Sequence, residues 1–283
     1  LYSISPVAIS AINSGRLSTM VILILLPLLI ISAQEVFELN KFTWRRVFGI
    51  SLLSSVIMAF SPIIFILGLL FTAFAISRDY AAADQGINQE LFNQRLHRRI
   101  ALLATPFLIC APWSFELLVD PKRFLIDSGF LIPGGGPDLA FVGNPGGPGS
   151  LPLYLVSPLT IVLAISLFSS TRARFVAELG FIALLTAVLV SAFSITGNGT
   201  SVPTPIYVGT LLTMATLAAI ASSVIMLDKL RERLVTTNIN YRHISAATLL
   251  LITAIYSVAA ISWTVTTGAN APLQTGKGVV LPP

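Results

Sequence analysis

The chain has 283 residues, of which 55% are hydrophobic and 10% are charged. An ordinary soluble domain carries about 25% charged residues, so this composition excludes a typical soluble globular protein. The formal net charge of +5 does not indicate nucleic-acid binding, because Lys and Arg in a membrane protein mark the cytoplasmic side.

Uncharged stretches of about 20 residues recur along the chain, which is the length that crosses a bilayer as a helix. We therefore expect an all-α, polytopic transmembrane bundle over residues 1–268, embedded in the cell membrane. It should have about seven membrane segments, an extracytoplasmic C-terminus and a flexible tail over residues 269–283. The expected segments lie near residues 17–34, 47–76, 100–119, 151–171, 178–196, 206–227 and 244–265.

The stretch 47–76 is longer than one span needs and contains Ser61-Pro62 near its centre. It is either one tilted helix kinked at this proline or two shorter helices that form a re-entrant hairpin. If it crosses, 11 of the 17 Lys and Arg residues share one side of the membrane; if it returns, 13 do, and the other four are Arg16, Lys122, Arg123 and Lys277. The majority side is cytoplasmic by the positive-inside rule.

Residues 81–99 follow the second segment and predict an amphipathic interfacial helix that ends in basic residues. Arg95, Arg98 and Arg99 would lie near anionic headgroups, which makes them candidates for binding a lipid phosphate. A plain solvated helix explains the same pattern equally well.

Residues 120–150 are rich in glycine and proline, and Asp138 is the one ionisable residue between 131 and 150. A phosphate-binding loop commonly contains Gly-Lys-Ser/Thr, which this stretch lacks. Backbone amides could still form an anion nest, but we interpret the stretch mainly as an extracytoplasmic spacer between spans.

A polar cluster closes the third expected segment, where carboxylates near the membrane raise the possibility of a functional site. Its members are close enough in sequence to neutralise one another, which favours a structural ion cluster at the interface: Glu116, Asp120, Lys122 and Arg123. No catalytic, metal-binding or cofactor motif is recognisable. His97 and His243 lack neighbouring ligands, and Cys110 is interpreted as a small core residue.

Several stretches together resemble one family. They are "SAINSGRLSTMVILILLPLL", "WRRVFGISLL", "APWSFELLVDPKRFLIDSGFLIP", "NPGGPGSLPLYL" and "GANAPLQTGKGVVLPP". They look like the C-terminal membrane region of large actinobacterial family-2 glycosyltransferases of the cell envelope. The resemblance implies a cytoplasmic sugar-nucleotide transferase domain upstream of Leu1, and a bundle that anchors it and holds a polyprenyl-phosphate-linked glycan. The chain begins with Leu1 rather than Met, which fits a piece of a longer protein.

Two other classes remain open on the sequence alone. One is a transporter or flippase of envelope precursors, although the central segments carry no charge. The other is an outer-face transferase that uses a lipid-phosphate sugar donor, in which Glu35 and Glu38 would serve from a first outer loop. A cytoplasmic location of residues 34–46 would exclude that second class.

Overall fold

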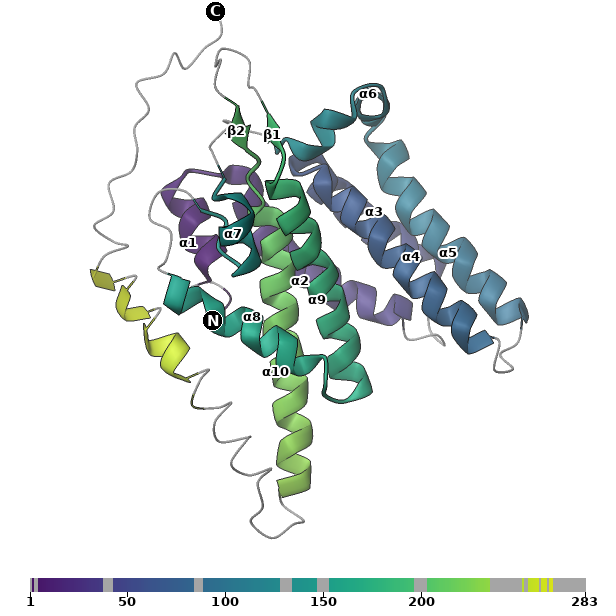
Figure 1. The fold of residues 1–283 in the computed structure, drawn as a ribbon. Coiled ribbons are helices and arrows are strands. Elements are labelled where there is room, and N and C mark those ends of the chain that lie inside the picture. Colours follow the sequence, from purple (N-terminus) through teal and green to yellow (C-terminus); the bar gives the residue numbers. More distant parts are fainter. Residues whose placement is uncertain are drawn as a thin grey trace, which may run out of the picture.

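The computed structural model describes residue 2 and residues 5–37, 43–83, 89–127, 134–146, 153–195, 203–234, 251, 254–259, 261–263 and 265–266. This part of the chain is mostly helical (Figure 1). The elements in chain order are α1 (Pro6–Asn13), α2 (Leu17–Phe37), α3 (Trp44–Phe60), α4 (Ile63–Ala83), α5 (Gln89–Ile109), α6 (Trp113–Val119), the 3-10 helix η2 (Pro121–Leu125), α7 (Gly136–Phe141), α8 (Leu153–Ser166), α9 (Thr171–Ser191), β1 (Ser194–Ile195), β2 (Thr204–Pro205) and α10 (Gly209–Leu234).

Helices α9 and α10 form the centre of the molecule and are joined by the antiparallel pair β1–β2. Thr171–Ser191 of α9 and Gly209–Asp228 of α10 are each long and apolar enough to cross a membrane. The bent pair α5–α6, whose axes differ by 101°, would make a third such segment if it acts as one span. The described residues thus contain two candidate membrane spans, or three with the bent pair.

Small side chains allow α9 and α10 to approach closely. Buried alanines recur along α9, at Ala173, Ala177, Ala183 and Ala187. At Gly180 an added Cβ would lie 2.5 Å from the Cβ of Ala218 on α10. Close backbone approach at small residues is how helices pack in a bilayer, where no hydrophobic force drives them together.

The expected segment 47–76 is two helices, α3 and α4, which are separated at Ser61-Pro62. Ser61 is extended, with φ −144° and ψ 94°, as is usual for a residue before proline. The direction of α3 follows from its contacts with α5. The Cys110 thiol lies 3.6 Å from the Ser55 carbonyl oxygen near the end of both helices, while Val47 at the start of α3 packs near Ala101 in the middle of α5.

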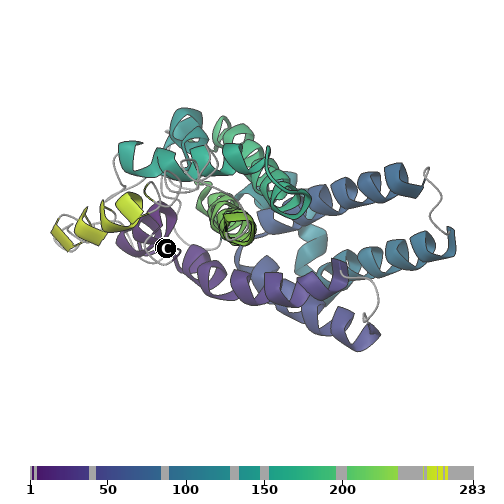
Figure 2. The ribbon, with the colours of Figure 1, turned by 90° about the horizontal axis from the view of Figure 1, so that it is seen from below.

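The direction of α4 is opposite. The ring of Phe65, near its start, lies 5.3 Å from the ring of Phe107 near the end of α5. Further along α4, Gly68 lies next to Leu103. Because α3 runs parallel to α5 and α4 runs antiparallel to it, α3 and α4 form an antiparallel hairpin (Figure 1). Viewed from below, α2, α3, α4 and α5 extend to one side of α10 (Figure 2).

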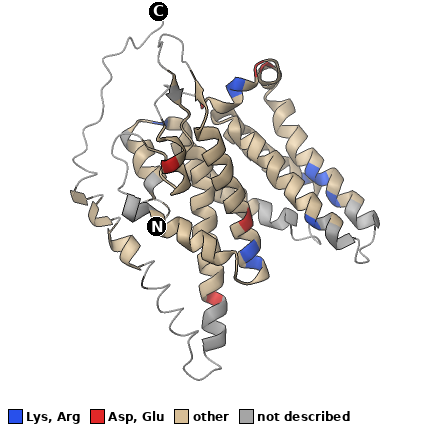
Figure 3. Ribbon diagram, in the orientation of Figure 1, with Lys and Arg blue, Asp and Glu red and all other residues tan. Residues whose placement is uncertain are grey.

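The hairpin gives the bundle two different ends. We call the end that carries α1, α6, α7, β1 and β2 the α7 end (Figure 1). We call the opposite end, where α3 begins and α4 ends, the cationic end, because Arg45, Arg46, Arg78, Arg172 and Arg174 belong to the helix termini there. Between the two ends most of the described ribbon carries no Lys, Arg, Asp or Glu (Figure 3).

Two predicted boundaries differ from the structure. The expected interfacial helix 81–99 is not a separate element, because residues 81–83 end α4 and α5 continues from Gln89 through Arg99 to Ile109. The expected segment 100–119 is interrupted between α5 and α6, at Cys110, Ala111 and Pro112. A helix does not end at the last charge when apolar residues continue to pack on its neighbours, which explains why charge patterning misplaced these limits.

Candidate functional site

Four polar residues from distant parts of the sequence meet inside the α7 end. They are Arg16 in the turn between α1 and α2, Ser61 between α3 and α4, Asp127 after η2, and Tyr207 just before α10. We call this group the buried junction. All four lie between helices, outside the candidate spans Thr171–Ser191 and Gly209–Asp228. Buried charged groups are rare and costly unless they are paired, so this group is the strongest candidate site in the described part of the chain.

Arg16 is positioned by the end of α1. Gly15 has φ +63°, a left-handed conformation that glycine adopts without a steric penalty and that commonly ends a helix. The guanidinium carbon of Arg16 then lies 3.6 Å from the centroid of the Tyr207 ring. The Arg16 side chain is almost fully enclosed, with 9% of its residue surface exposed. A desolvated cation over an aromatic face contributes about 2 kcal/mol.

The Tyr207 ring can occupy this position because residue 209 is a glycine and has no side chain. A Cβ at Gly209 would collide with the Tyr207 ring and its hydroxyl oxygen. Burial raises the pKa of the Tyr207 hydroxyl, and the opposing influences of Ser10 and Arg16 are smaller. The tyrosine is therefore neutral at physiological pH and acts in the junction as a ring and a neutral hydroxyl.

Asp127 contributes the negative member of the junction. Its Oδ1 accepts a hydrogen bond from the Ser61 hydroxyl. Burial raises the pKa of the Asp127 carboxyl to about 6, although the hydrogen bond from Ser61 and the charge of Arg16 act in the opposite direction. Burial also lowers the pKa of Arg16, with Tyr207 and Asp127 opposing this effect. Arg16 and Asp127 thus form an electrostatically coupled pair in a water-poor setting.

Several hydroxyls surround the pair. Ser10 on α1 donates to the carbonyl oxygen of Gly146 at 2.6 Å. The oxygens of Thr19 and Thr210, Oη of Tyr207 and Oδ2 of Asp127 are buried without a hydrogen-bond partner. Unsatisfied polar atoms are uncommon inside proteins and call for an explanation such as strain, bound water or a switching role.

The glycine- and proline-rich stretch is more ordered than the predicted spacer. Its described residues 134–146 contain the short helix α7, and Ala140 belongs to the main hydrophobic core. The Gly134 amide donates to the Pro205 carbonyl at 2.9 Å, and the Gly146 amide donates to Oδ1 of Asn144 at 2.9 Å. These amides are already satisfied by the protein, which argues against the anion nest that the glycine content allowed.

The predicted polar cluster at the end of α6 is an exposed ion network. Arg123 donates to Glu116 at 2.7 Å and lies 3.4 Å from Asp120. Lys122 is exposed beside them on η2. Exposed ion pairs contribute between about 0 and 1 kcal/mol, so this network fits an interfacial structural role better than chemistry.

The predicted lipid-phosphate residues Arg95, Arg98 and Arg99 lie together on α5, half-buried. At the same end, one acidic side chain near the start of α9 pairs with an arginine of α4 and an arginine of α9. Glu178 accepts from Arg174 at 2.9 Å and from Arg78 at 3.4 Å. Glu178 therefore neutralises part of the positive charge at the cationic end.

Other candidates carry less chemistry. In the part of the chain that is described, no three His, Cys, Asp or Glu side chains come together to hold a metal ion. Cys110 is half-buried beside the cluster of Met58, Leu117 and Phe124, as expected for a small core residue. The side chain of Glu35, and residues Glu38 and His243, lie outside the described structure.

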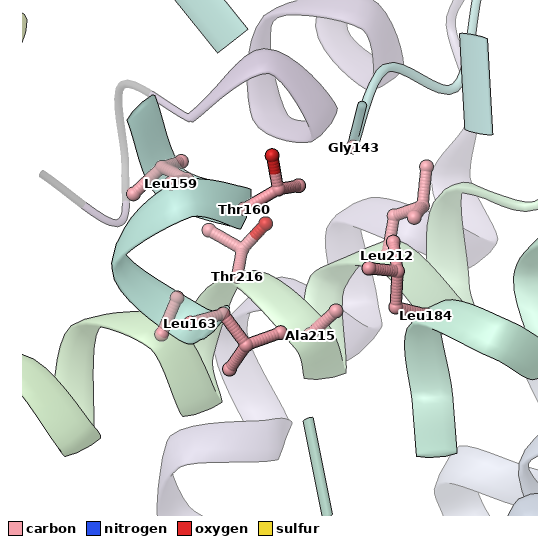
Figure 4. A pocket seen from close by; sticks show the side chains of 9 residues that line it. Gly143, Leu159, Thr160, Leu163, Leu184, Leu212, Ala215 and Thr216 are labelled. Atoms are coloured by element: carbon pink, nitrogen blue, oxygen red, sulfur yellow. The ribbon is translucent and has the colours of Figure 1, made fainter. Parts of the chain in front are cut away.

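A small cavity lies between α8, α9 and α10 (Figure 4). It has room for about one water molecule. Its walls are largely apolar, with Thr160 and Thr216 as the polar side chains, and its lining residues are Gly143, Leu159, Thr160, Leu163, Leu184, Leu212, Ala215, Thr216 and Ala219. An apolar space of this size does not provide a binding site for a charged or sugar-like ligand.

Sequence reasoning did not find the buried junction. It treats Arg16 as a charge that orients the bundle and gives no role to Ser61, Asp127 or Tyr207. The available signal is weak: Arg16 and Asp127 are isolated charges that each border long apolar stretches. Comparison with known proteins adds no assignment, since no family model, no curated protein and no solved structure matches this chain.

Proposed function

We propose that this chain is the membrane-embedded part of a cell-envelope glycosyltransferase. It anchors a cytoplasmic sugar-nucleotide transferase domain that lies upstream in the same polypeptide, and it holds a polyprenyl-phosphate-linked glycan. The support is the resemblance of five stretches to that family, together with a helical bundle that contains apolar, membrane-length helices.

The proposed topology is multi-pass, with about seven membrane segments in the cell membrane. The antiparallel hairpin α3–α4 returns the chain to the end of the bundle where α3 begins. This supports the model in which 13 Lys and Arg residues lie on one side of the membrane and four on the other. The positive-inside rule then assigns the cationic end to the cytoplasm and the α7 end, with the C-terminus, to the outside.

The observation that carries the acceptor-binding role is the position of Arg95, Arg98 and Arg99. These three cations lie on one helix, half-buried, toward the cationic end of the bundle. Lys and Arg near a membrane surface each contribute about 1 kcal/mol to the binding of anionic lipid. A lipid phosphate held there would lie next to the proposed upstream transferase domain.

The test replaces Arg95, Arg98 and Arg99 together with Gln in the full-length protein and measures lipid-linked glycan formation in isolated membranes. We expect affinity for the anionic lipid to fall about 100-fold, which corresponds to the loss of three contributions of about 1 kcal/mol. Replacing the same residues with Lys retains the charge and should preserve most of the product.

The matched control replaces Lys122 and Arg123 with Gln, which removes two exposed cations at the opposite end of the bundle. This variant should form product at the unmodified level. Normal product formation by the Gln variant of the α5 arginines would contradict the acceptor-binding role, provided that both proteins reach the membrane in equal amounts.

The structure counts against an outer-face transferase and is compatible with a transporter or flippase. Leu29 of α2 packs against the cluster of Val47 and Ile50 near the start of α3, so the last turns of α2, which include Glu35, lie toward the cationic end. This position counts against an outer-face transferase. A transporter or flippase is the second candidate. It is favoured by the 101° break between α5 and α6, because discontinuous helices are typical of transport sites.

A further inference from the structure

The buried junction joins four segments that are remote in the sequence. Asp127, two residues after the end of η2, connects residues 121–127 to the junction. We infer that the junction is a proton-operated latch, which holds residues 121–127 against the α7 end when Asp127 is protonated and releases them when Asp127 is ionised. This inference goes beyond the proposed transferase role and does not depend on it.

The geometry around the carboxyl group supports a preference for the protonated form. Asp127 Oδ1 receives a hydrogen bond from Ser61, while Oδ2 is buried and no residue in the described part of the chain donates to it. An ionised carboxylate accepts hydrogen bonds at both oxygens. An enclosed site that supplies one donor therefore stabilises the neutral acid better than the anion, which gains by reaching water.

Among the described residues, the charged and titratable groups that face Asp127 are Arg16 and Tyr207. Arg16 approaches from the turn between α1 and α2, and the neutral Tyr207 approaches from the entry to α10. Ser61, from the turn between α3 and α4, is not titratable. On η2 itself, Arg123 is exposed and pairs with Glu116 and Asp120. Arg16 is thus the positive charge that attracts ionised Asp127 and opposes the release of residues 121–127.

The direction of the pH effect follows from the raised pKa of Asp127. Its value is about 6 in the closed junction against an ordinary value of 3.8. The closed form is therefore favoured below pH 4 and loses this advantage as the pH rises through 6. The ratio of closed to open molecules should fall about 100-fold across that interval.

The experiment measures the distance between two spin labels on the full chain in lipid nanodiscs between pH 4.5 and 8. The labels are attached to cysteines that replace Lys122 on η2, which is exposed, and Phe193 next to β1, which is 62% exposed. Cys110 is replaced by Ser to remove the native thiol. We expect the short distance to predominate at pH 4.5, and a second, longer distance to gain population up to about pH 6 and to stay constant above it.

Two variants test whether ionisation of Asp127 causes the pH response. Asp127→Asn retains the shape of the side chain but cannot ionise, so it should show the short distance at every pH. Asp138→Asn is the matched control, because Asp138 is an exposed acid on α7 at the same end, and it should respond as the unmodified protein does. A pH-independent distance in the unmodified protein, or an unchanged pH response in Asp127→Asn, would overturn the inference.

Ser61→Ala keeps the test informative if Asp127→Asn does not fold. Loss of the Ser61 hydroxyl removes a hydrogen bond to Asp127 that stabilises the anion more strongly than the neutral acid in the closed form. The longer distance should therefore be more populated at pH 8 in this variant, with the low-pH distance unchanged. An unaltered population at pH 8 would contradict the latch. The readout involves no sugar transfer, so its outcome is separate from that of the transferase proposal.

Discussion

Tyr207 makes two contributions to the junction that can be separated by substitution. Its ring supports the Arg16 guanidinium, whereas its hydroxyl is buried without a hydrogen-bond partner. Tyr207→Leu should lower the free energy of unfolding by about 2 kcal/mol, because a desolvated cation–π contact is lost. Tyr207→Phe keeps the ring and should change stability by less than about 0.5 kcal/mol, since it removes a group that makes no hydrogen bond.

Unfolding in a denaturing detergent, followed by circular dichroism, measures both variants against the unmodified protein. Equal destabilisation by Phe and Leu would mean that the hydroxyl, rather than the ring, stabilises the junction.

At the scale of single residues, the sequence predicts contacts between near neighbours better than contacts between distant ones. Glu116 and Arg123 are seven positions apart and form an ion pair, which proximity in the chain already suggests. Arg16, Asp127 and Tyr207 are brought together by the packing of three connections between helices. Nothing in the spacing of these residues indicates that they meet.

At the scale of elements, the closest helix contact offers a direct test. Gly180→Ala would place a methyl group 2.5 Å from the Cβ of Ala218 and 2.8 Å from Cδ1 of Leu163. Overpacking of this kind costs about 1–3 kcal/mol, so α9 and α10 should separate slightly and the protein should unfold at a lower detergent concentration.

Gly49→Ala on α3 is the matched control, because no atom lies within 4 Å of the added Cβ. Alanine is a better helix former than glycine by about 1 kcal/mol, so this variant should be as stable as the unmodified protein or more so. If both variants had the same stability, the small residues of α9 would not be what sets the distance between the two helices.

The sequence predicts the existence of most helices but not how they end. Apolar composition and Ser61-Pro62 are sufficient to offer a hairpin as one of two alternatives for residues 47–76. They do not decide between them, because the choice depends on the contacts of α3 and α4 with α5. The structured part of the glycine-rich stretch is missed for a similar reason, since Ala140 becomes a core residue by packing against distant helices.

At the scale of the whole molecule, the hairpin predicts which surfaces share a side of the membrane. Single cysteines can replace Thr43, before α3, and Lys122, on η2, in a protein whose Cys110 has been removed. A membrane-impermeant maleimide should then label one of the two positions in intact cells and the other only in opened cells. We expect Lys122→Cys to be labelled from outside and Thr43→Cys to be labelled after the membrane is opened. Labelling of both positions from outside would contradict the antiparallel arrangement of α3 and α4 in the membrane.

The composition indicates a membrane location, since too few charged residues are present to cover a soluble surface, and two helices are long and apolar enough to cross a bilayer. The arrangement of the segments does not follow from composition. The apolar part of α8 is shorter than a full span, and the pair α5–α6 is bent. The tilt and path of such helices depend on packing against neighbouring helices, which hydropathy does not predict.

The turn between α1 and α2 has a consequence for how this bundle could be joined to another domain. Arg16 in that turn meets Asp127 and Tyr207 at the α7 end, opposite the arginines that terminate α3 and α4. If those arginines face the cytoplasm, the polypeptide enters α1 from the external side. A transferase domain earlier in the same polypeptide can then work on cytoplasmic sugar nucleotides if an odd number of membrane crossings separates it from α1, and a direct fusion to α1 would place it on the wrong side.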